Sequence, residues 1–172
     1  HGAARSAYTT LTDEDLMKLP IQDIAKKDSM LFLWTTGAKL DVAIDVMRAW
    51  GFDFLAHVFA WHKTYASGKP YHGIGFWTMH GLQNVLLGKR GKGLPRREDT
   101  RGHVKQVFSS PARRHSEKPS IHQNIELLVG GECKRIELFA RQQVAGWDAT
   151  GLECDGVDIR DFLTTEEKEE PE

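Results

Sequence analysis

The amino-acid sequence predicts an α/β fold with a Rossmann-type, mostly parallel central sheet, and three neighbouring segments indicate it. Residues 30–34 (MLFLW) form a continuous apolar run, which is typical of a strand buried on both faces of a parallel sheet. Residues 37–50 carry apolar side chains at helical spacing, and Gly51 follows them. Residues 54–61 (FLAHVFAW) form a second apolar strand. Strand, helix and strand in this order predict a βαβ unit with a right-handed crossover.

The other elements have weaker signals. Residues 12–15 (TDED) resemble a capping box and predict a short helix that Pro20 ends. Residues 84–87 (NVLL) predict a third strand, and residues 104–108 predict an edge strand. We expect one domain over residues 1–154, because 172 residues suffice for a single core. Residues 155–172 contain eight acidic and two basic side chains and predict an acidic tail, disordered from about Thr164.

We expect the functional residues of this chain mainly within residues 109–141. Pro119 suits the first position of a helix, which residues 130–131 (GG) would end. The apolar stripe of this helix consists of Ile121, Ile125 and Leu128. Residues 135–140 (RIELFA) then predict a strand that delivers Arg141 to its C-terminal end. Because ligands of open α/β sheets bind outside the C-terminal ends of strands, Arg141 and the preceding basic loop are where we expect chemistry.

Basic side chains are concentrated in the middle of the sequence. Ten basic and three acidic residues lie between Lys89 and Lys118, although the net charge of the whole chain is −1. A mobile basic loop beside a pocket would bind a polyanion such as nucleic acid. A solvated surface is the simpler alternative, and the composition leaves both open.

Several common sites are not indicated. Gly73 and Gly75 do not complete the dinucleotide-binding pattern G-x-G-x-x-G, and no P-loop is present. The serines near His115 have no base–acid partner at a suitable spacing, so we expect no hydrolase triad. Cys133 and Cys154 lack metal-ligand spacing, and we expect no metal. With no secretory signal or apolar membrane span, they predict reduced thiols in a cytoplasmic protein.

Seven short blocks, in this order along the chain, resemble the MTA-type adenine-N6 methyltransferases. This is the family of the catalytic subunit of the eukaryotic messenger-RNA adenosine methyltransferase, with compact bacterial and phage members. The blocks are YTTLTDED (8–15), LFLWTT (31–36), WHKT (61–64), NVLLGKRG (84–91), HSEKPS (115–120), IELFAR (136–141) and GWDATGLE (146–153). The resemblance implies a permuted Rossmann-like sheet and transfer of a methyl group from S-adenosylmethionine to the N6 amine of adenine.

The resemblance also implies site residues. Lys118 matches a lysine beside both the cofactor and the target base, and Arg141 matches an arginine that clamps the cofactor. Glu153 would accept hydrogen bonds from the ribose, whereas Leu152 replaces a family asparagine and loses one hydrogen bond. The implied cofactor-binding residues are Lys118, Phe139, Arg141, Gln142, Leu152 and Glu153. Tyr8 and Lys118 are the implied catalytic residues; Tyr8 lies in the loop that covers the base in this family, or it is a packed loop aromatic.

The basic middle segment would supply the phosphate contacts. The expected nucleic-acid-binding residues are Lys89, Arg90, Arg96, Arg97, Arg113, Arg114 and His115. The compact chain favours DNA over RNA as the substrate, and a homo- or heterodimer is compatible with the sequence. We expect Trp34, Trp61 and Trp77 to be structural rather than stacked on bases. His62 and Lys63 are expected in a solvated loop.

The family signature Asp-Pro-Pro-Trp does not occur in the sequence. In relatives it ends a central strand shortly before the position of Tyr8, and it holds the adenine amine. We expect this strand to precede His1 in the whole protein, because its loss would expose the apolar faces of its neighbours. The alternatives are a catalytically inactive nucleic-acid-binding partner subunit, and an α/β domain for another nucleotide ligand.

Overall fold

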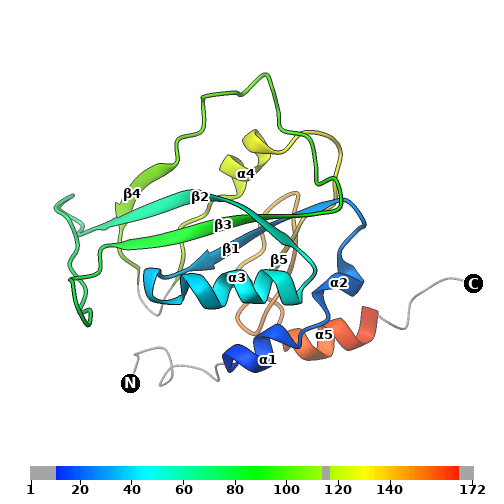
Figure 1. The fold of residues 1–172 in the computed structure, drawn as a ribbon. Helices are drawn as coiled ribbons and strands as arrows, with labels where there is room; N and C mark the ends of the chain where they lie inside the picture. The colour runs from blue at the N-terminus through cyan, green and yellow to red at the C-terminus, as the bar shows by residue number, and fades with distance from the viewer. Residues whose placement is uncertain (1–10, 114–116, 167–172) are drawn as a thin grey trace, which may run out of the picture.

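The computed structural model describes residues 11–113 and 117–166. Its main sheet has four strands, in the order β1 (Ser29–Thr35), β3 (Leu82–Arg90), β2 (Asp53–Thr64) and β4 (Val107–Pro111) (Figure 1). A second sheet consists of two parallel strands, β5 (Ile136–Leu138) and β6 (Asp148–Thr150). The helices are α1 (Asp13–Met17), α2 (Ile21–Ile24), α3 (Leu40–Ala49, after a 3-10 turn at Gly37–Lys39), α4 (His122–Leu128) and α5 (Ile159–Glu166).

The prediction of a mostly parallel sheet is wrong. β3 lies between β1 and β2 and pairs antiparallel with both, and only β2 and β4 pair in parallel within the main sheet. The reason is that β3 follows β2 through a hairpin loop, and strands connected in this way pair antiparallel. β1 and β2 still run in the same direction, as a βαβ unit requires, but β3 separates them.

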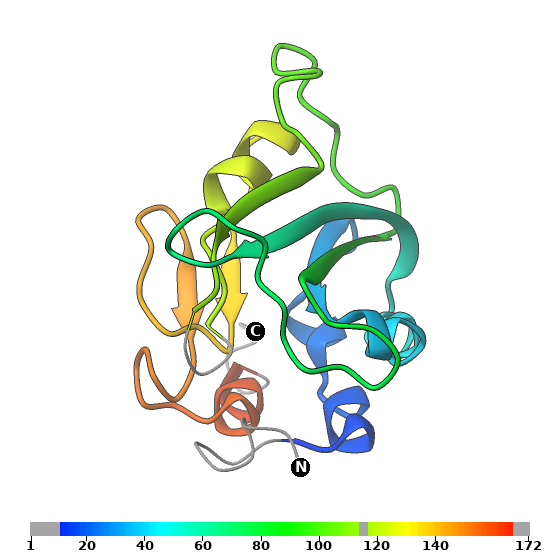
Figure 2. The ribbon, with the colours of Figure 1, turned by 90° about the vertical axis from the view of Figure 1, so that its left-hand side faces the viewer.

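Helices α3 and α4 cover opposite faces of the main sheet (Figure 2). On one face, Val46 and Met47 of α3 pack against Leu86 of β3. On the other face, Ile125 of α4 packs against Val85 of β3. Successive side chains of a strand point to opposite faces, so the two neighbours on β3 belong to different core clusters. The predicted apolar face of α3 is confirmed for Ala43 and Met47, which are buried, whereas Leu40 at its start is 38% exposed.

Local signals located several elements correctly, with shifted boundaries. Thr12 is the N-cap of α1, and its side chain accepts a hydrogen bond from the N–H of Asp15 at 3.1 Å. All seven residues of β1 are only half-buried, contrary to expectation, because β1 is an edge strand. The edge strand expected at residues 104–108 lies further along, at β4. The helix expected from Pro119 begins at His122.

The prediction of an acidic tail is wrong for its first part. Residues Ile159–Glu166 form α5, and Ile159 and Leu163 are buried in the core cluster that contains α3. These two side chains lie one helical turn apart, and Phe162 of the same helix is partly buried against the same cluster, so the three form its apolar stripe. An acid-rich segment can therefore pack through a stripe of very few residues. Residues 167–172 lie outside the described part of the chain.

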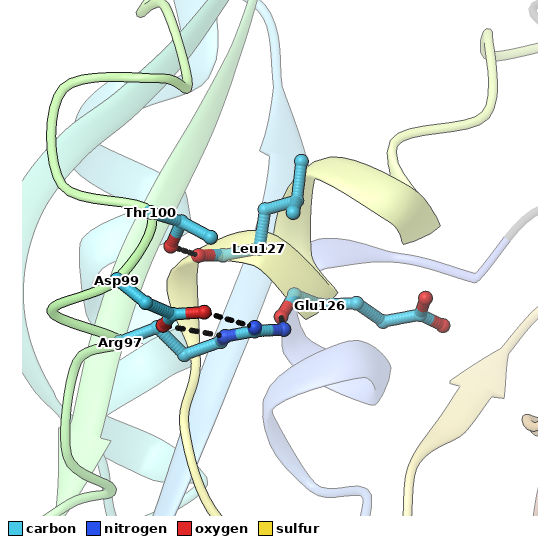
Figure 3. Close-up of polar contacts among 5 residues, drawn as sticks. All are labelled: Arg97, Asp99, Thr100, Glu126 and Leu127. Carbon is cyan, nitrogen blue, oxygen red and sulfur yellow. Dashed lines mark hydrogen bonds and ion pairs between the residues drawn. The ribbon is translucent and has the colours of Figure 1, made fainter.

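The basic segment before β4, which the sequence suggested to be mobile, is anchored to the end of α4 (Figure 3). The backbone N–H of Arg97 donates to the Leu128 carbonyl at 2.9 Å, and the Arg97 guanidinium donates to the Glu126 carbonyl at 3.4 Å. The Thr100 hydroxyl donates to the Leu127 carbonyl. A distant segment thus caps the carbonyls that a helix end leaves without intrahelical partners.

Candidate functional site

The candidate site lies where β2 and β4 end and β3 begins. His62, near the end of β2, is opposite Leu82 of β3 and Ser109 of β4, and its Nδ1 lies 3.2 Å from the Ser109 hydroxyl. β1, β2 and β4 run in the same direction, so their C-terminal ends share this edge of the sheet. Ligand sites of α/β proteins are commonly found at such an edge.

Three cations from distant segments interact at this edge: Lys63, Lys118 and Arg141, here called the site cations. Burial, together with the positive charges of Lys63 and Arg141, lowers the pKa of Lys118 to about 8. Burial also lowers the pKa of Lys63, whose Nζ lies 5.0 Å from the centre of the Trp61 ring. His62 and Lys63 both lie in β2 and are half-buried, so the expectation of a solvated loop is wrong.

Pairing of β5 with β6 brings the two segments of the implied cofactor site together. The N–H of Ala140 donates to the Thr150 carbonyl at 2.9 Å. Just beyond this contact, Nη2 of Arg141 lies 3.3 Å from Oε1 of Glu153. Arg141 is half-buried, whereas Phe139, Gln142 and Leu152 are exposed beside it. The structure therefore joins Arg141 and Glu153 as an ion pair and leaves the other three side chains at the surface.

Two backbone features of this region escaped sequence analysis. A Cβ atom on Gly151 would lie 2.4 Å from the Ala140 carbonyl oxygen, so only glycine allows the two segments to approach this closely. Phe139 has a φ of 59°, in the left-handed region, which costs a non-glycine residue about 1–3 kcal/mol. Such strained residues concentrate at functional sites, and Phe139 directly precedes the segment that carries Arg141.

Asp155 fixes the turn after β6. Its carboxylate accepts hydrogen bonds from the N–H groups of Gly151 and Val157, each at 3.0 Å, and these bonds lower its pKa. Glu153 lies within this turn, so Asp155 stabilises the backbone that presents it to Arg141. An aspartate that accepts a hydrogen bond from the N–H two residues further on is a common turn former, and the pair of Asp155 and Gly156 could have indicated this role.

A polar network connects the loop that carries Lys118 with the strand that precedes Arg141. The Ser120 hydroxyl lies 2.9 Å from Nδ1 of His122, and Nε2 of His122 lies 3.0 Å from the Glu137 carboxylate. The Trp147 ring packs edge-on against His122, with 4.6 Å between the ring centres. Sequence analysis missed this network, because its members are separated along the chain and share no motif.

The predicted nucleic-acid-binding residues are not gathered around this site. Lys89 and Arg90 lie at the C-terminal end of β3, and because β3 is antiparallel to its neighbours, this is the opposite end of the sheet. Arg90 donates a hydrogen bond to the Gln22 carbonyl at 2.7 Å. These two residues therefore cannot contact a ligand held between the site cations.

Three further arginines were predicted to bind nucleic acid and lie after β3 in the described part of the chain. Each is paired with an acidic residue close by in the sequence. The pairs are Arg96 with Glu98 at 3.2 Å, Arg97 with Asp99 at 2.5 Å, and Arg113 with Glu117 at 2.5 Å. Their charge is therefore largely neutralised within the segment. Arg114, His115 and Tyr8 lie outside the described residues.

The structural role expected for three tryptophans is confirmed for two of them and wrong for the third. Trp61 is buried, and Trp34 packs edge-on against it with 6.2 Å between the ring centres, which confirms their structural role. Trp77 is 92% exposed, so its expected place in the core is wrong. It lies in the loop between β2 and β3, where the local sequence gave no sign of which side chains would face solvent.

Two hollows lie at the N-terminal ends of β5 and β6, and Arg135 and Gly146 line both. Neither hollow is lined by Lys118 or Arg141, and the candidate site is identified by its charges and its ion pair. In residues 11–113 and 117–166, no three His, Cys, Asp or Glu side chains are placed to hold a metal ion. No helix in this described part is long and apolar enough to cross a membrane.

Comparison with known proteins agrees with the resemblance of the seven blocks. Residues 2–153 match the MT-A70 family. The chain belongs to the MT-A70 family. Methyltransferases of this family use S-adenosylmethionine as the methyl donor.

Individual relatives show how much of each protein is shared. The chain is 34% identical to the type II methyltransferase M.MunI of a Mycoplasma species, over 88% of this chain and 61% of the relative. It is 32% identical to the N(6)-adenosine-methyltransferase subunit METTL3 of Danio rerio and 30% identical to the METTL3 catalytic subunit of Homo sapiens. Each METTL3 match covers 90% of this chain and 26% of the relative. The MT-A70 chain thus spans less than two thirds of these relatives.

Proposed function

We propose that this MT-A70 chain binds S-adenosylmethionine at Lys118, Arg141 and Glu153 and transfers the methyl group to the N6 amine of adenine in DNA. The observation that supports this proposal is the ion pair between Arg141 and Glu153, formed beside the cation of Lys118. An arginine fork suits a carboxylate, and a glutamate accepts hydrogen bonds from hydroxyl groups. Together they complement the amino-acid carboxylate and the ribose of the cofactor.

The side chains present here act by orientation rather than by covalent chemistry. When bound, S-adenosylmethionine supplies a methyl group attached to a positively charged sulfur. Lys118, with a pKa of about 8, is mostly protonated at pH 7 and would hold an anionic or hydroxyl group of the ligand. Phe139 offers an apolar ring beside Arg141. Holding two reactants in the correct geometry can supply much of the rate enhancement, and an adenine in a duplex must first be flipped out.

DNA is favoured over RNA because the match to M.MunI is higher in identity and covers more of the relative than the matches to METTL3. RNA remains the alternative substrate. A second candidate function is that of an inactive nucleic-acid-binding partner, because no Asp-Pro-Pro-Trp occurs in these residues. The Danio rerio relative is named as a methyltransferase subunit. By analogy, we propose that this chain functions as a homo- or heterodimer.

Two measurements test the proposal. Isothermal titration with S-adenosylmethionine and S-adenosylhomocysteine should show binding. Transfer of labelled methyl groups to matched DNA and RNA oligonucleotides, each with one adenine, should favour DNA. Faster methylation of the RNA oligonucleotide would show that RNA, the alternative substrate, is preferred. Cofactor binding without transfer to either polymer would favour the inactive partner, and absence of cofactor binding would refute the site itself.

A further inference from the structure

The loop of residues 65–81, between β2 and β3, exposes an unusual amount of apolar surface. At its tip, Ile74, Phe76 and Trp77 are 94%, 95% and 92% exposed, and Met79 is 58% exposed. Single exposed apolar side chains need no explanation, but four within six residues of one loop favour an interaction site. The rings of Phe76 and Trp77 stand together edge-on, with 6.1 Å between their centres.

This exposure is a property of a well-defined hairpin. Gly73 and His80 exchange two backbone hydrogen bonds, each of 2.8 Å, and thereby close the tip. A Cβ atom on Gly75 would lie 2.0 Å from the Thr78 carbonyl oxygen, so the tip is tightly folded around this glycine. The backbone hydrogen bonding therefore directs the apolar side chains outward.

The hairpin begins at the edge of the sheet that carries the candidate site. The N–H of Tyr71 donates to the Lys63 carbonyl at 3.0 Å, and the N–H of Lys63 donates to the Gly81 carbonyl at 2.8 Å. The charge of Lys63 in turn acts on Lys118. In Figure 1 the hairpin extends from the ends of β2 and β3, on the left of the molecule.

The charge of this surface identifies the kind of partner. No aspartate or glutamate occurs between Phe54 and Arg97, and the loop itself carries Lys69, His72 and His80. A partner should therefore be anionic and offer flat apolar faces, and nucleic acid has both properties. We propose that Phe76 and Trp77 stack on nucleobases next to the target adenine. This inference rests on the proposed function, because it assumes that nucleic acid reaches the same edge.

Tryptophan fluorescence offers a direct test. The protein has five tryptophans, and Trp50 and Trp61 are 2% and 1% exposed, while Trp34 and Trp147 are half-buried. Quenching by acrylamide should therefore report mainly on Trp77. A single-stranded, adenine-containing DNA oligonucleotide should shield Trp77 from acrylamide, and the Trp77→Phe variant should lose this signal while it still binds. Heparin, a polyanion without bases, should bind without shielding Trp77.

Measuring the affinity for an oligonucleotide provides a second, independent test. The double variant Phe76→Ala/Trp77→Ala should bind a labelled oligonucleotide at least about fivefold more weakly, since base stacking contributes about 1–3 kcal/mol per base. Leu55→Ala is the matched control, because Leu55 is 50% exposed near the other end of β2, and its affinity should be unchanged. Circular dichroism of both variants verifies that the fold is retained.

Three results would overturn the proposal. One is that Trp77 remains accessible to acrylamide when bound oligonucleotide, followed by anisotropy, reaches saturation. Another is that shielding depends only on protein concentration and sedimentation shows a dimer, which would assign the hairpin to self-association. The third is an oligonucleotide affinity that is absent or equal in the wild type and the double variant. If the protein fails to bind S-adenosylmethionine but the oligonucleotide still shields Trp77, the proposed catalysis is refuted and the proposed base stacking is not.

Discussion

Two groups of positive charge in this MT-A70 chain differ in how the fold uses them. The arginines of residues 96–101 pair with acids two or three positions away, and Arg97 caps α4. The site cations come from three distant segments, and the pKa of Lys118 is lowered first by burial and then by the charges of Lys63 and Arg141. A basic run in a sequence therefore need not mark a binding site. Cations that the fold brings together against their repulsion are a better indication, because such an arrangement reduces stability unless a ligand uses it.

Arg141→Ala should have the largest effect. We expect it to weaken binding of S-adenosylmethionine by roughly 10- to 100-fold, because a hydrogen bond to a charged group contributes about 1.5–3 kcal/mol. Isothermal titration measures the affinity. Arg97→Ala makes the same side-chain change among the arginines of residues 96–101 and should leave the affinity unaltered. Equal losses in the two variants would contradict the distinction between the two groups.

The affinity for S-adenosylmethionine should also fall by about tenfold between pH 7 and pH 9. With a pKa of about 8, the Lys118 ammonium is protonated at the lower pH and mostly neutral at the higher one. Lys118→Arg keeps its charge over this range, so its affinity should change much less with pH. A variant with the wild-type slope would show that another group controls the pH dependence.

Arg97→Ala should lower the free energy of unfolding by about 1–2 kcal/mol, because α4 loses a hydrogen bond and a cation at its C-terminus. Urea denaturation followed by circular dichroism measures this change. Arg48→Ala, which removes an exposed pair with Asp45 on α3, is the control and should cost at most about 0.5 kcal/mol. A loss no greater than the control's would mean that the cap is dispensable.

Lys118→Met should have the smallest effect, and in the opposite direction. Removing a charge that is buried among like charges should raise the free energy of unfolding at pH 7 by on the order of 1 kcal/mol. Between pH 8 and pH 10.5 the folded wild type holds fewer protons on Lys118 than the unfolded chain, so its stability rises and the difference from the variant shrinks. A destabilised variant at pH 7 would show that contacts of the ammonium outweigh its burial.

The sequence predicted those parts of the fold that depend on neighbouring residues. The cap at Thr12, the apolar face of α3 and the approximate positions of the strands follow from spacing and composition. The resemblance identified the family and named Lys118 and Arg141, which the structure brings close enough to affect each other's charge. Local patterns were informative here because caps and helical stripes are formed within a few residues.

The sequence could not predict which distant segments would meet. The position of β3 between β1 and β2 depends on the hairpin that follows β2, and the packing of α5 depends on a site formed by α1, α2 and α3. Likewise, Lys63 was assigned to a solvated loop but lies half-buried in β2, and Trp77 was assigned to the core but is exposed. Local composition says that a side chain is apolar or charged, whereas burial depends on what packs against it.

By itself, the sequence determined the α/β class, most of the regular elements, and the family with its methyl donor. The tertiary structure alone decided the strand order, the joining of Arg141 to Glu153, and which cations meet at the candidate site. The physical reason is the range of the forces involved. Helical propensity and capping act over one or two turns, but the free energy of a charge depends on every group that the fold places around it.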